Sequence, residues 1–309
     1  MAKGIVIGGP TGAGKTNLSL NLAKILNAHI ISADSAQIYK GLDIGTAKIT
    51  PEEMKGIPHH MIDIVEPLEK YNVGEYQRNV NNLLNNFEKE KINILLVGGT
   101  GLYIDSISEG LSSLPQGDKN IREKLSSYTK EELYRKLLEV DKEAAQNIHI
   151  NNRIRTERAL EVFLLTGEKF SILSKKNIKE NNYDFLKIAL EFPREILYER
   201  INKRVDIMIE KGLIDEVTNL YDKYGENLTK LNIIGYNEII SYLKKDFSLE
   251  KAIYNIKINS RRYAKRQLTW FKNDPKYTWY LCSQNNENFI FEDVLYKFEK
   301  KRPYNKITT

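Results

Sequence analysis

The fold of this chain is decided by the stretch Gly4-Ile5-Val6-Ile7-Gly8-Gly9-Pro10-Thr11-Gly12-Ala13-Gly14-Lys15-Thr16. Its apolar beginning predicts a short buried strand, and the segment from Gly9 to Thr16 fits the pattern G-x-x-x-x-G-K-[ST] of a phosphate-binding loop, or P-loop. The backbone N–H groups of such a loop, the amino end of the following helix and the Lys15 ammonium all attract a phosphate. We therefore expect this loop to bind a phosphate or diphosphate, and Thr16 to offer its hydroxyl to Mg²⁺.

The segment after the loop continues the pattern of a parallel α/β sheet. Leu18, Leu22 and Leu26 form one apolar stripe of a helix that ends near residue 27, and residues 29–33 then predict a second strand. Asp34 follows this strand at the sheet edge where parallel sheets build their sites. Its carboxylate can serve there as a general base or as a magnesium ligand, or can simply cap a surface turn.

A third buried strand, residues 92–97, ends in a second glycine-rich loop, Gly98-Gly99-Thr100-Gly101. Typical P-loop NTPases often place an Asp at the end of such a strand, where it binds magnesium, and here a glycine stands in that place. The amides of this loop and the Thr100 hydroxyl could receive anionic oxygens. We therefore expect a diphosphate to be held from two sides.

The alternation of strands and helices stops near residue 112 and resumes at residue 186. The stretch between them is polar and helical in pattern, without a convincing strand. We predict an α/β protein whose P-loop NTPase-like core, residues 1–112 and 185–309, is a parallel sheet flanked by helices with a helical C-terminal part. Residues 113–184 form a mainly helical insertion domain, whose basic residues alternate with acidic ones and could be no more than a solvated face.

Charge and composition narrow the choice of partner and compartment. The 309-residue chain has a net charge of +6 and a pI near 9.0, which weakly favours an anionic partner. Its single cysteine, Cys282, excludes an intrachain disulfide and a cysteine-based metal cluster. No stretch approaches 18 apolar residues in a row, so we expect a cytoplasmic protein without a membrane partner.

Residues 257–272 contain basic residues and no acidic one, and the basic residues are Lys257, Arg261, Arg262, Lys265, Arg266 and Lys272. Like charges four residues apart destabilise a helix, so the pattern favours a polyanion-binding helix over a merely solvated one. Trp270 and Phe271 at its end could stack on bases, although core packing is the favoured interpretation.

The chain as a whole resembles the bacterial tRNA dimethylallyltransferases, also called the tRNA isopentenyltransferase family. The resemblance rests on the P-loop and on motifs spread over essentially the full length: Asp34-Ser35-Ala36-Gln37-Ile38-Tyr39, Ile44-Gly45-Thr46-Ala47-Lys48, Pro58-His59-His60, Val97-Gly98-Gly99-Thr100-Gly101-Leu102-Tyr103, Arg158-Ala159-Leu160-Glu161, Gly212-Leu213-Ile214-Asp215-Glu216-Val217, Ile234-Gly235-Tyr236 and Tyr263-Ala264-Lys265-Arg266-Gln267.

The resemblance implies transfer of a dimethylallyl group from dimethylallyl diphosphate to the N6 amine of the adenosine 3′-adjacent to the anticodon, giving N6-isopentenyladenosine. The catalytic residues would be Asp34, which accepts the amine proton, and Lys15 and Thr100, which stabilise the departing diphosphate. Mg²⁺ would be the cofactor, bound by Thr16. The implied diphosphate-binding residues are Gly9, Pro10, Thr11, Gly12, Ala13, Gly14, Lys15 and Thr16.

The resemblance also implies that the enzyme binds the tRNA anticodon stem-loop as a monomer. The implied RNA-binding residues are Asp34, Ser35, Ala36, Gln37, Thr100, Arg122, Ile154, Arg155, Thr156, Glu157, Arg158, Arg261, Arg262, Lys265 and Arg266. Ile154 departs from the family, which has Gln there.

Three alternatives remain open. A prenyltransferase acting on free adenine nucleotides would not need the basic helix and the insertion. A P-loop small-molecule kinase would be expected to carry an acid after Val97, and a non-catalytic RNA-binding protein would not need Asp34 and Thr100 beside a P-loop.

Overall fold

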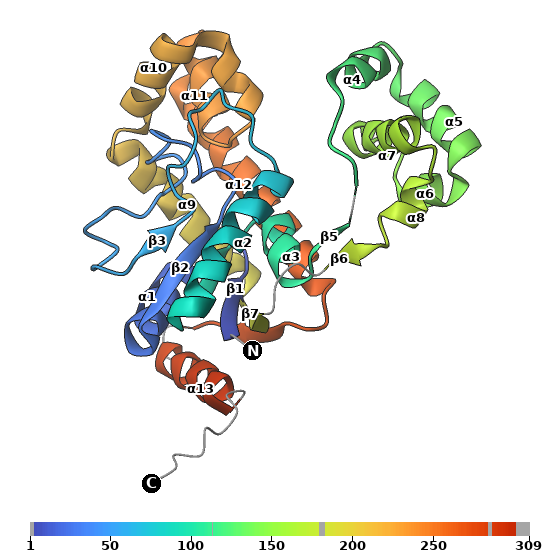
Figure 1. Cartoon of the computed structure of the whole chain (residues 1–309). Helices are drawn as coiled ribbons and strands as arrows, with labels where there is room; N and C mark the ends of the chain where they lie inside the picture. Colours follow the sequence, from blue (N-terminus) through green and yellow to red (C-terminus); the bar gives the residue numbers. More distant parts are fainter. Residues whose placement is uncertain (1–2, 113, 179–182, 284–285, 301–309) are drawn as a thin grey trace. The chain divides into compact units, whose positions relative to one another are not determined.

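The computed structural model describes residues 3–112, 114–178, 183–283 and 286–300, which form two compact units (Figure 1). Unit 1 comprises Met1–Ser108 and Asn181–Thr309, and unit 2 comprises Glu109–Glu180. Both boundaries fall four residues before the expected ones, at 108 against 112 and at 180 against 184. The reason at the first boundary is that Leu111 and Ser112 pair with a strand of unit 2.

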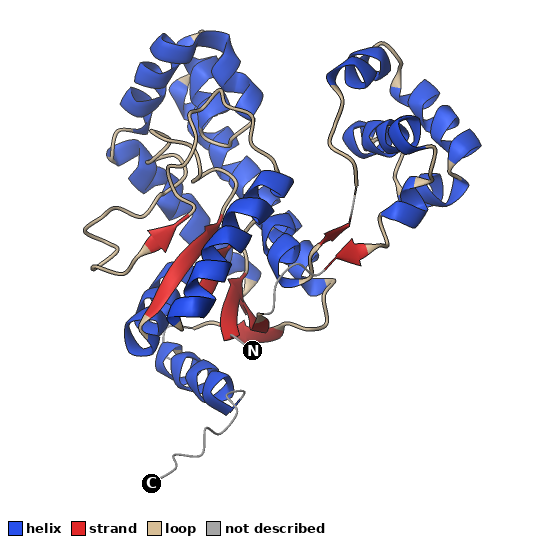
Figure 2. Cartoon of the chain, in the orientation of Figure 1, coloured by secondary structure: helices blue, strands red, loops and turns tan. Residues whose placement is uncertain are grey.

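Unit 1 contains a six-stranded sheet in the order β3-β2-β4-β1-β7-β8, and every neighbouring pair in it is parallel. The strands are β1 (Lys3–Gly8), β2 (Ala28–Ala33), β3 (His59–His60), β4 (Asn93–Gly98), β7 (Asp184–Glu191) and β8 (Thr278–Leu281). The predicted α/β class with a parallel sheet flanked by helices is therefore confirmed (Figure 2). Because β2, β4 and β1 are neighbours, the segments that follow them lie at one edge of the sheet.

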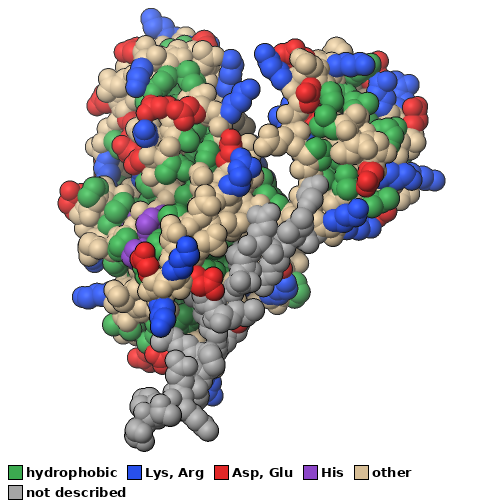
Figure 3. All heavy atoms as spheres, in the orientation of Figure 1, with side chains coloured by type: hydrophobic (Ala, Val, Ile, Leu, Met, Phe, Trp, Pro, Cys, Tyr) green, Lys and Arg blue, Asp and Glu red, His purple; other side chains and the backbone are tan. Residues whose placement is uncertain are grey.

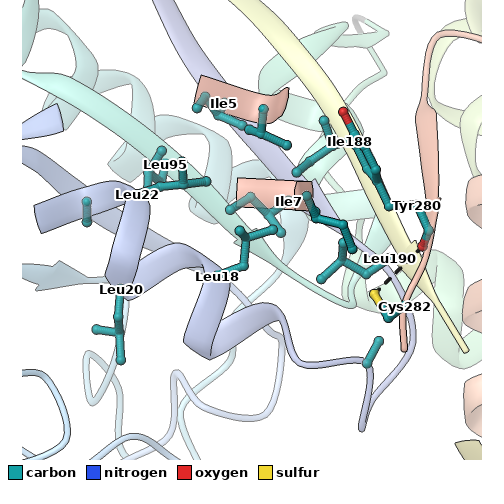
Figure 4. Close-up of a cluster of buried hydrophobic side chains, with 14 of the residues drawn as sticks. Ile5, Ile7, Leu18, Leu20, Leu22, Leu95, Ile188, Leu190, Tyr280 and Cys282 are labelled. Atoms are coloured by element: carbon teal, nitrogen blue, oxygen red, sulfur yellow. Dashed lines mark hydrogen bonds between the residues drawn. The ribbon is translucent and has the colours of Figure 1, made fainter. Parts of the chain in front are cut away.

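Helices cover both faces of this sheet because alternate residues of each strand point to opposite sides. Ile5 and Ile7 of β1 pack with Leu18 and Ile188 in one buried cluster, whereas Val6 belongs to the cluster on the other face (Figure 4). Each such side chain stabilises the fold by about 1.5–3 kcal/mol. The first face carries α1 (Lys15–Leu26) and α13 (Glu287–Lys300), and the second carries α2 (Val73–Glu90) and α3 (Gly101–Ser108).

The helical C-terminal part forms a further cluster around Val205, Val217 and Ile239. Its helices are α9 (Arg194–Glu210), α10 (Leu213–Tyr224), the 3₁₀ helix η1 (Gly225–Leu231), α11 (Tyr236–Leu243) and α12 (Leu249–Lys272). The last turns of α12 also reach the sheet, because Phe271 is fully buried in the cluster of the second face. Phe271 thus packs in the core, whereas the Trp270 side chain is 45% exposed.

Unit 2 is mainly helical, with α4 (Lys119–Ser126), α5 (Lys130–Val140), α6 (Lys142–Asn147), α7 (Arg153–Thr166) and α8 (Phe170–Leu173) around a small apolar core. It also contains the antiparallel pair of β5 (Leu111–Ser112) and β6 (Asn177–Ile178), so the expectation of no strand in this stretch was wrong. Two residues per strand are too few to produce a periodic pattern in the sequence. Across the described ranges, no helix has an apolar stretch long enough to cross a bilayer.

Candidate active site

The P-loop joins β1 to α1 by backbone conformations that favour glycine. Gly9 has a φ of +136°, and a Cβ atom there would lie 2.6 Å from the carbonyl oxygen of Leu190. Gly14 has a φ of +81° and directly precedes the first residue of α1, Lys15. The loop therefore presents its amides and the amino end of α1 to one point, as phosphate binding requires.

Lys15 is half-buried at this point and is hydrogen-bonded to its own loop. Its Nζ donates to the carbonyl oxygens of Gly9, at 2.9 Å, and Pro10, at 2.8 Å. Burial and the nearby charge of Arg204 lower the pKa of Lys15 to about 7, and the charge of Asp34 opposes this shift. A bound anion would compete for the ammonium and raise its pKa again.

Two arginines of α9 also reach the P-loop, and the sequence did not suggest them. Arg204 donates from Nη1 to the Thr11 hydroxyl, at 2.8 Å, while Arg200 donates from Nε to the carbonyl oxygen of Gly12, at 2.8 Å. They lie four residues apart, each directly before a buried residue of the apolar stripe, Ile201 or Val205. This position beside the buried stripe of α9 is the signal in the sequence that could have pointed to the two arginines.

The second glycine loop is tied to the end of β2. The Thr100 hydroxyl accepts a hydrogen bond from the Ser35 backbone N–H, at 3.0 Å, and lies 3.3 Å from the Ser35 hydroxyl. The Thr100 N–H donates to the carbonyl oxygen of Ala33, at 3.0 Å. A Cβ atom at Gly98 would lie 2.1 Å from that same oxygen, so only glycine lets the two strand ends approach this closely.

Asp34 follows β2, at the same edge of the sheet as the second glycine loop after β4 and the P-loop after β1. Its Oδ1 accepts a hydrogen bond from the Ala36 N–H, at 2.9 Å, which fixes the carboxylate in a turn. Its charge raises the pKa of Lys15 against the effect of burial, and acts in the same direction on Arg204. Asp34 is thus a half-buried carboxylate whose charge interacts with Lys15 of the P-loop and with Arg204 of α9.

Gln37 completes the turn that follows β2. Its Oε1 accepts a hydrogen bond from the Ser32 hydroxyl, at 3.2 Å, and its Nε2 lies 3.4 Å from the carbonyl oxygens of both Thr46 and Ala47. The guanidinium of Arg204 donates to the same Thr46 oxygen, at 3.2 Å. The predicted residues 34–37 and the P-loop are thus connected through one backbone segment.

The four basic residues predicted on α12 do not share one environment. Arg262, Lys265 and Arg266 are exposed, and Arg262 and Arg266 line a cavity of about 240 Å³. Arg261 is half-buried and donates from Nη1 to the Asn202 side chain on α9, at 3.0 Å. Three of these four residues therefore face solvent, while Arg261 holds α12 against α9.

In unit 2, Arg122 and Arg158 converge on Glu161, whose side chain is only 1% exposed. Arg122 donates from Nε at 2.7 Å and Arg158 from Nη1 at 2.5 Å. Burial is the largest single effect on the pKa of Glu161 and raises it, but the hydrogen bonds and charges of its partners together outweigh burial and lower the pKa. The same contact raises the pKa of Arg122. The two arginines therefore have a structural partner within the unit.

The remaining predicted residues of unit 2 lie on the first turns of α7. Ile154 is 80% exposed and Arg155 is exposed, whereas Glu157 is paired with Arg153 at 2.6 Å. Thr156 is 1% exposed, and the structure does not bring it to the surface, because it lies on the face of α7 that is buried within the unit. Lys and Arg side chains stand around the visible face of unit 2 in Figure 3.

Fold and site together define an α/β protein of the P-loop class, with Asp34, a second glycine loop and the P-loop at the ends of three neighbouring parallel strands. More specifically, the chain belongs to the IPP transferase family, whose model matches residues 37–274. It is 59% identical to a tRNA dimethylallyltransferase of Fusobacterium nucleatum subsp. nucleatum, over 97% of this chain and 98% of the relative. A tRNA dimethylallyltransferase of Halothermothrix orenii is 48% identical over 94% of this chain and 90% of its own length.

Solved structures agree with this assignment. The full-length tRNA isopentenylpyrophosphate transferase of Bacillus halodurans is similar with a TM-score of 0.73 and 41% identity, over 97% of this chain and 98% of that one. A eukaryotic dimethylallyltransferase acting on tRNA gives a TM-score of 0.82 at 28% identity, over 99% of this chain and 82% of that one.

Proposed function

We propose that this protein transfers a dimethylallyl group from dimethylallyl diphosphate to the N6 amine of the adenosine on the 3′ side of the tRNA anticodon. The observation that carries the proposal is the meeting of the P-loop, Asp34 and Thr100 at the carboxyl ends of three neighbouring strands. The similarity to tRNA dimethylallyltransferases over nearly the whole chain supports the same substrates. None of the relatives reported above is named as a kinase or as acting on free nucleotides.

In the proposed reaction, the N6 lone pair attacks the allylic C1 carbon, the C1–O bond breaks, and its electron pair leaves with the diphosphate. Asp34 accepts the proton that the amine loses as the new N–C bond forms. The P-loop amides, Lys15 and Arg204 bind the leaving diphosphate from one side, and the Thr100 loop from the other. Because these donors are already in place, they stabilise the charge as it develops.

We also propose that Mg²⁺ assists this step by neutralising diphosphate oxygens. Within the described residues, no three His, Cys, Asp or Glu side chains form a metal-binding group. That fits Mg²⁺, which keeps several waters and takes only one or two protein ligands beside phosphate oxygens. The Thr16 hydroxyl, near the start of α1, is the oxygen donor of this chain that would hold it.

Recognition of the tRNA would use both units. The exposed cations Arg262, Lys265 and Arg266 of α12 suit the phosphate backbone, as does Arg155 of unit 2. Residues 34–37 and Thr100 would contact the target adenosine, which must leave its stack to reach Asp34. We expect a monomeric enzyme that works in the cytoplasm, where its tRNA substrate is found.

The test is transfer of label from radiolabelled dimethylallyl diphosphate to unmodified tRNA, run beside free AMP and beside ATP hydrolysis. We expect label in tRNA alone, and none when the target adenosine is replaced by guanosine. Label in AMP would instead assign the protein to nucleotide prenylation. Phosphate release from ATP without label transfer would overturn the proposal in favour of a kinase.

A further inference from the structure

The last turns of α12 lie directly against both glycine loops. At Gly99 a Cβ atom would stand 2.0 Å from Nε2 of Gln267, and at Gly101 it would stand 2.2 Å from the Trp270 ring. The glycines are therefore needed because α12 occupies the space their side chains would fill. This contact brings one buried amide, that of Gln267, between the two loops.

The Gln267 side chain joins the loops through both ends of its amide. Its Oε1 accepts a hydrogen bond from the Thr11 N–H of the P-loop, at 2.9 Å, and its Nε2 donates to the carbonyl oxygen of Gly99, at 3.0 Å. Gln267 is only 6% exposed, so water cannot easily replace either bond.

We propose that Gln267 is a positioning residue that sets the spacing between the P-loop and the second glycine loop. This inference rests on the proposed function, in which the two loops hold opposite sides of one diphosphate. An amide is suited to the task because it offers a donor and an acceptor at once, whereas a carboxylate offers only acceptors. Because both ends of its amide are bonded to loop backbone, Gln267 would act through the loops and not on the reacting atoms.

The spacing matters most when charge develops on the leaving diphosphate. A loop displaced by about 1 Å still binds a flexible diphosphate but no longer directs its donors at the transition state. Loss of the bridge should therefore lower kcat for transfer by at least about tenfold, while KM for tRNA, which depends on surfaces elsewhere, stays within about twofold.

The test compares full-length Gln267→Met and Gln267→Glu with Gln77→Met. Gln77 of α2 is a matched control because it is also 6% exposed and donates its Nε2 to a backbone oxygen at 2.9 Å, but this oxygen belongs to Ser106 near the end of α3 and not to either loop. We expect both Gln267 variants to lose kcat and Gln77→Met to keep it, with all three folded by circular dichroism. If Gln267→Met does not fold, Gln267→Asn, whose shorter amide cannot span both loops, takes its place.

A pH profile separates positioning from packing. In Gln267→Glu, a protonated carboxyl again offers one donor and one acceptor, so its kcat relative to wild type should rise as the pH is lowered, whereas that of Gln267→Met should not change. Unchanged kcat in both variants, or an equal loss in Gln77→Met, would overturn the inference. Because wild-type transfer to tRNA is measured in the same series, failure of the proposed function would appear separately.

Discussion

Lys15 donates two hydrogen bonds to its own loop, and its pKa of about 7 means that the amine is mostly neutral above pH 7. A bound diphosphate favours the ammonium and raises this pKa, so binding above pH 7 takes up a proton. We expect the affinity for inorganic diphosphate to fall with rising pH above 7, by up to about tenfold per pH unit. Isothermal titration calorimetry from pH 6 to 9 measures it.

Diphosphate itself titrates in this range, so the matched control is Lys15→Arg, whose guanidinium stays charged. The pH dependence that remains in Lys15→Arg belongs to the ligand, and the difference between the two proteins belongs to Lys15. Identical pH profiles would show that Lys15 does not titrate on binding.

Asp34 should matter for the chemical step more than for binding. In Asp34→Asn the amide cannot accept the N6 proton, and we expect the single-turnover rate of transfer to fall by about 10²–10⁴-fold. Diphosphate affinity should be unchanged or higher, because a negative charge near Lys15 and Arg204 has been removed. An unchanged single-turnover rate would exclude Asp34 as the base.

At this scale the sequence predicted as site residues those whose type and position belong to a motif, such as Lys15, Asp34 and Thr100. It did not point to Arg200, Arg204 and Gln267. These side chains stand on helices more than 180 residues from the P-loop, at 188 residues in the case of Arg200 and Gly12. A helical pattern shows that such residues border a buried face, and only the tertiary fold shows what that face contacts.

Among the elements, α10 fixes the segment that connects Gln37 and Arg204. The Glu216 carboxylate of α10 accepts hydrogen bonds from the N–H groups of Asp43, at 3.1 Å, Ile44, at 2.7 Å, and Gly45, at 3.1 Å, and from the Tyr236 hydroxyl, at 2.6 Å. One carboxylate thus satisfies three consecutive amides.

Glu216→Gln should weaken this anchor. The neutral amide has one acceptor oxygen in place of two and an NH₂ group that faces N–H donors, so we expect unfolding to become easier by about 1–3 kcal/mol. Urea denaturation measures this change. The control is Glu226→Gln, which removes the charge of an exposed ion pair with Lys244 and should change the free energy of unfolding much less. Equal effects would contradict the anchoring role.

Long elements were predictable because each carries a periodic apolar face. The helix predicted to end near residue 27 is α1 (Lys15–Leu26), and the strand predicted over residues 92–97 is β4 (Asn93–Gly98). Two-residue strands such as β6 contain too few residues for a period, and their pairing depends on partners far along the chain. Thr156 was predicted to bind RNA on the resemblance alone, which assigns a residue by its place in the family's motif and does not show that this residue lies on the buried face of α7.

For the molecule as a whole, the proposal places phosphate contacts in both units. Arg262→Gln in unit 1 and Arg155→Gln in unit 2 should each lower the slope of log K against log salt concentration by about one, and the double variant by about two. Filter binding of unmodified tRNA from 50 to 300 mM salt measures the slopes. Arg261→Gln is the control, because its guanidinium is bound to Asn202. A slope that does not change in either single variant would remove that residue from the interface.

The pairing of β1 with β7 also has a consequence for how the chain is made. Lys3 of β1 pairs with Asp184 of β7. About 180 residues must therefore be synthesised after β1 begins before β7 can cover the second edge of β1. At about 5–20 residues per second, the nascent chain leaves this edge open for about 10–40 s, while unit 2 emerges and can fold. Open strand edges are prone to aggregation. During this interval the ribosome-bound chain should therefore depend on chaperones more than a protein whose paired strands are close together in the sequence.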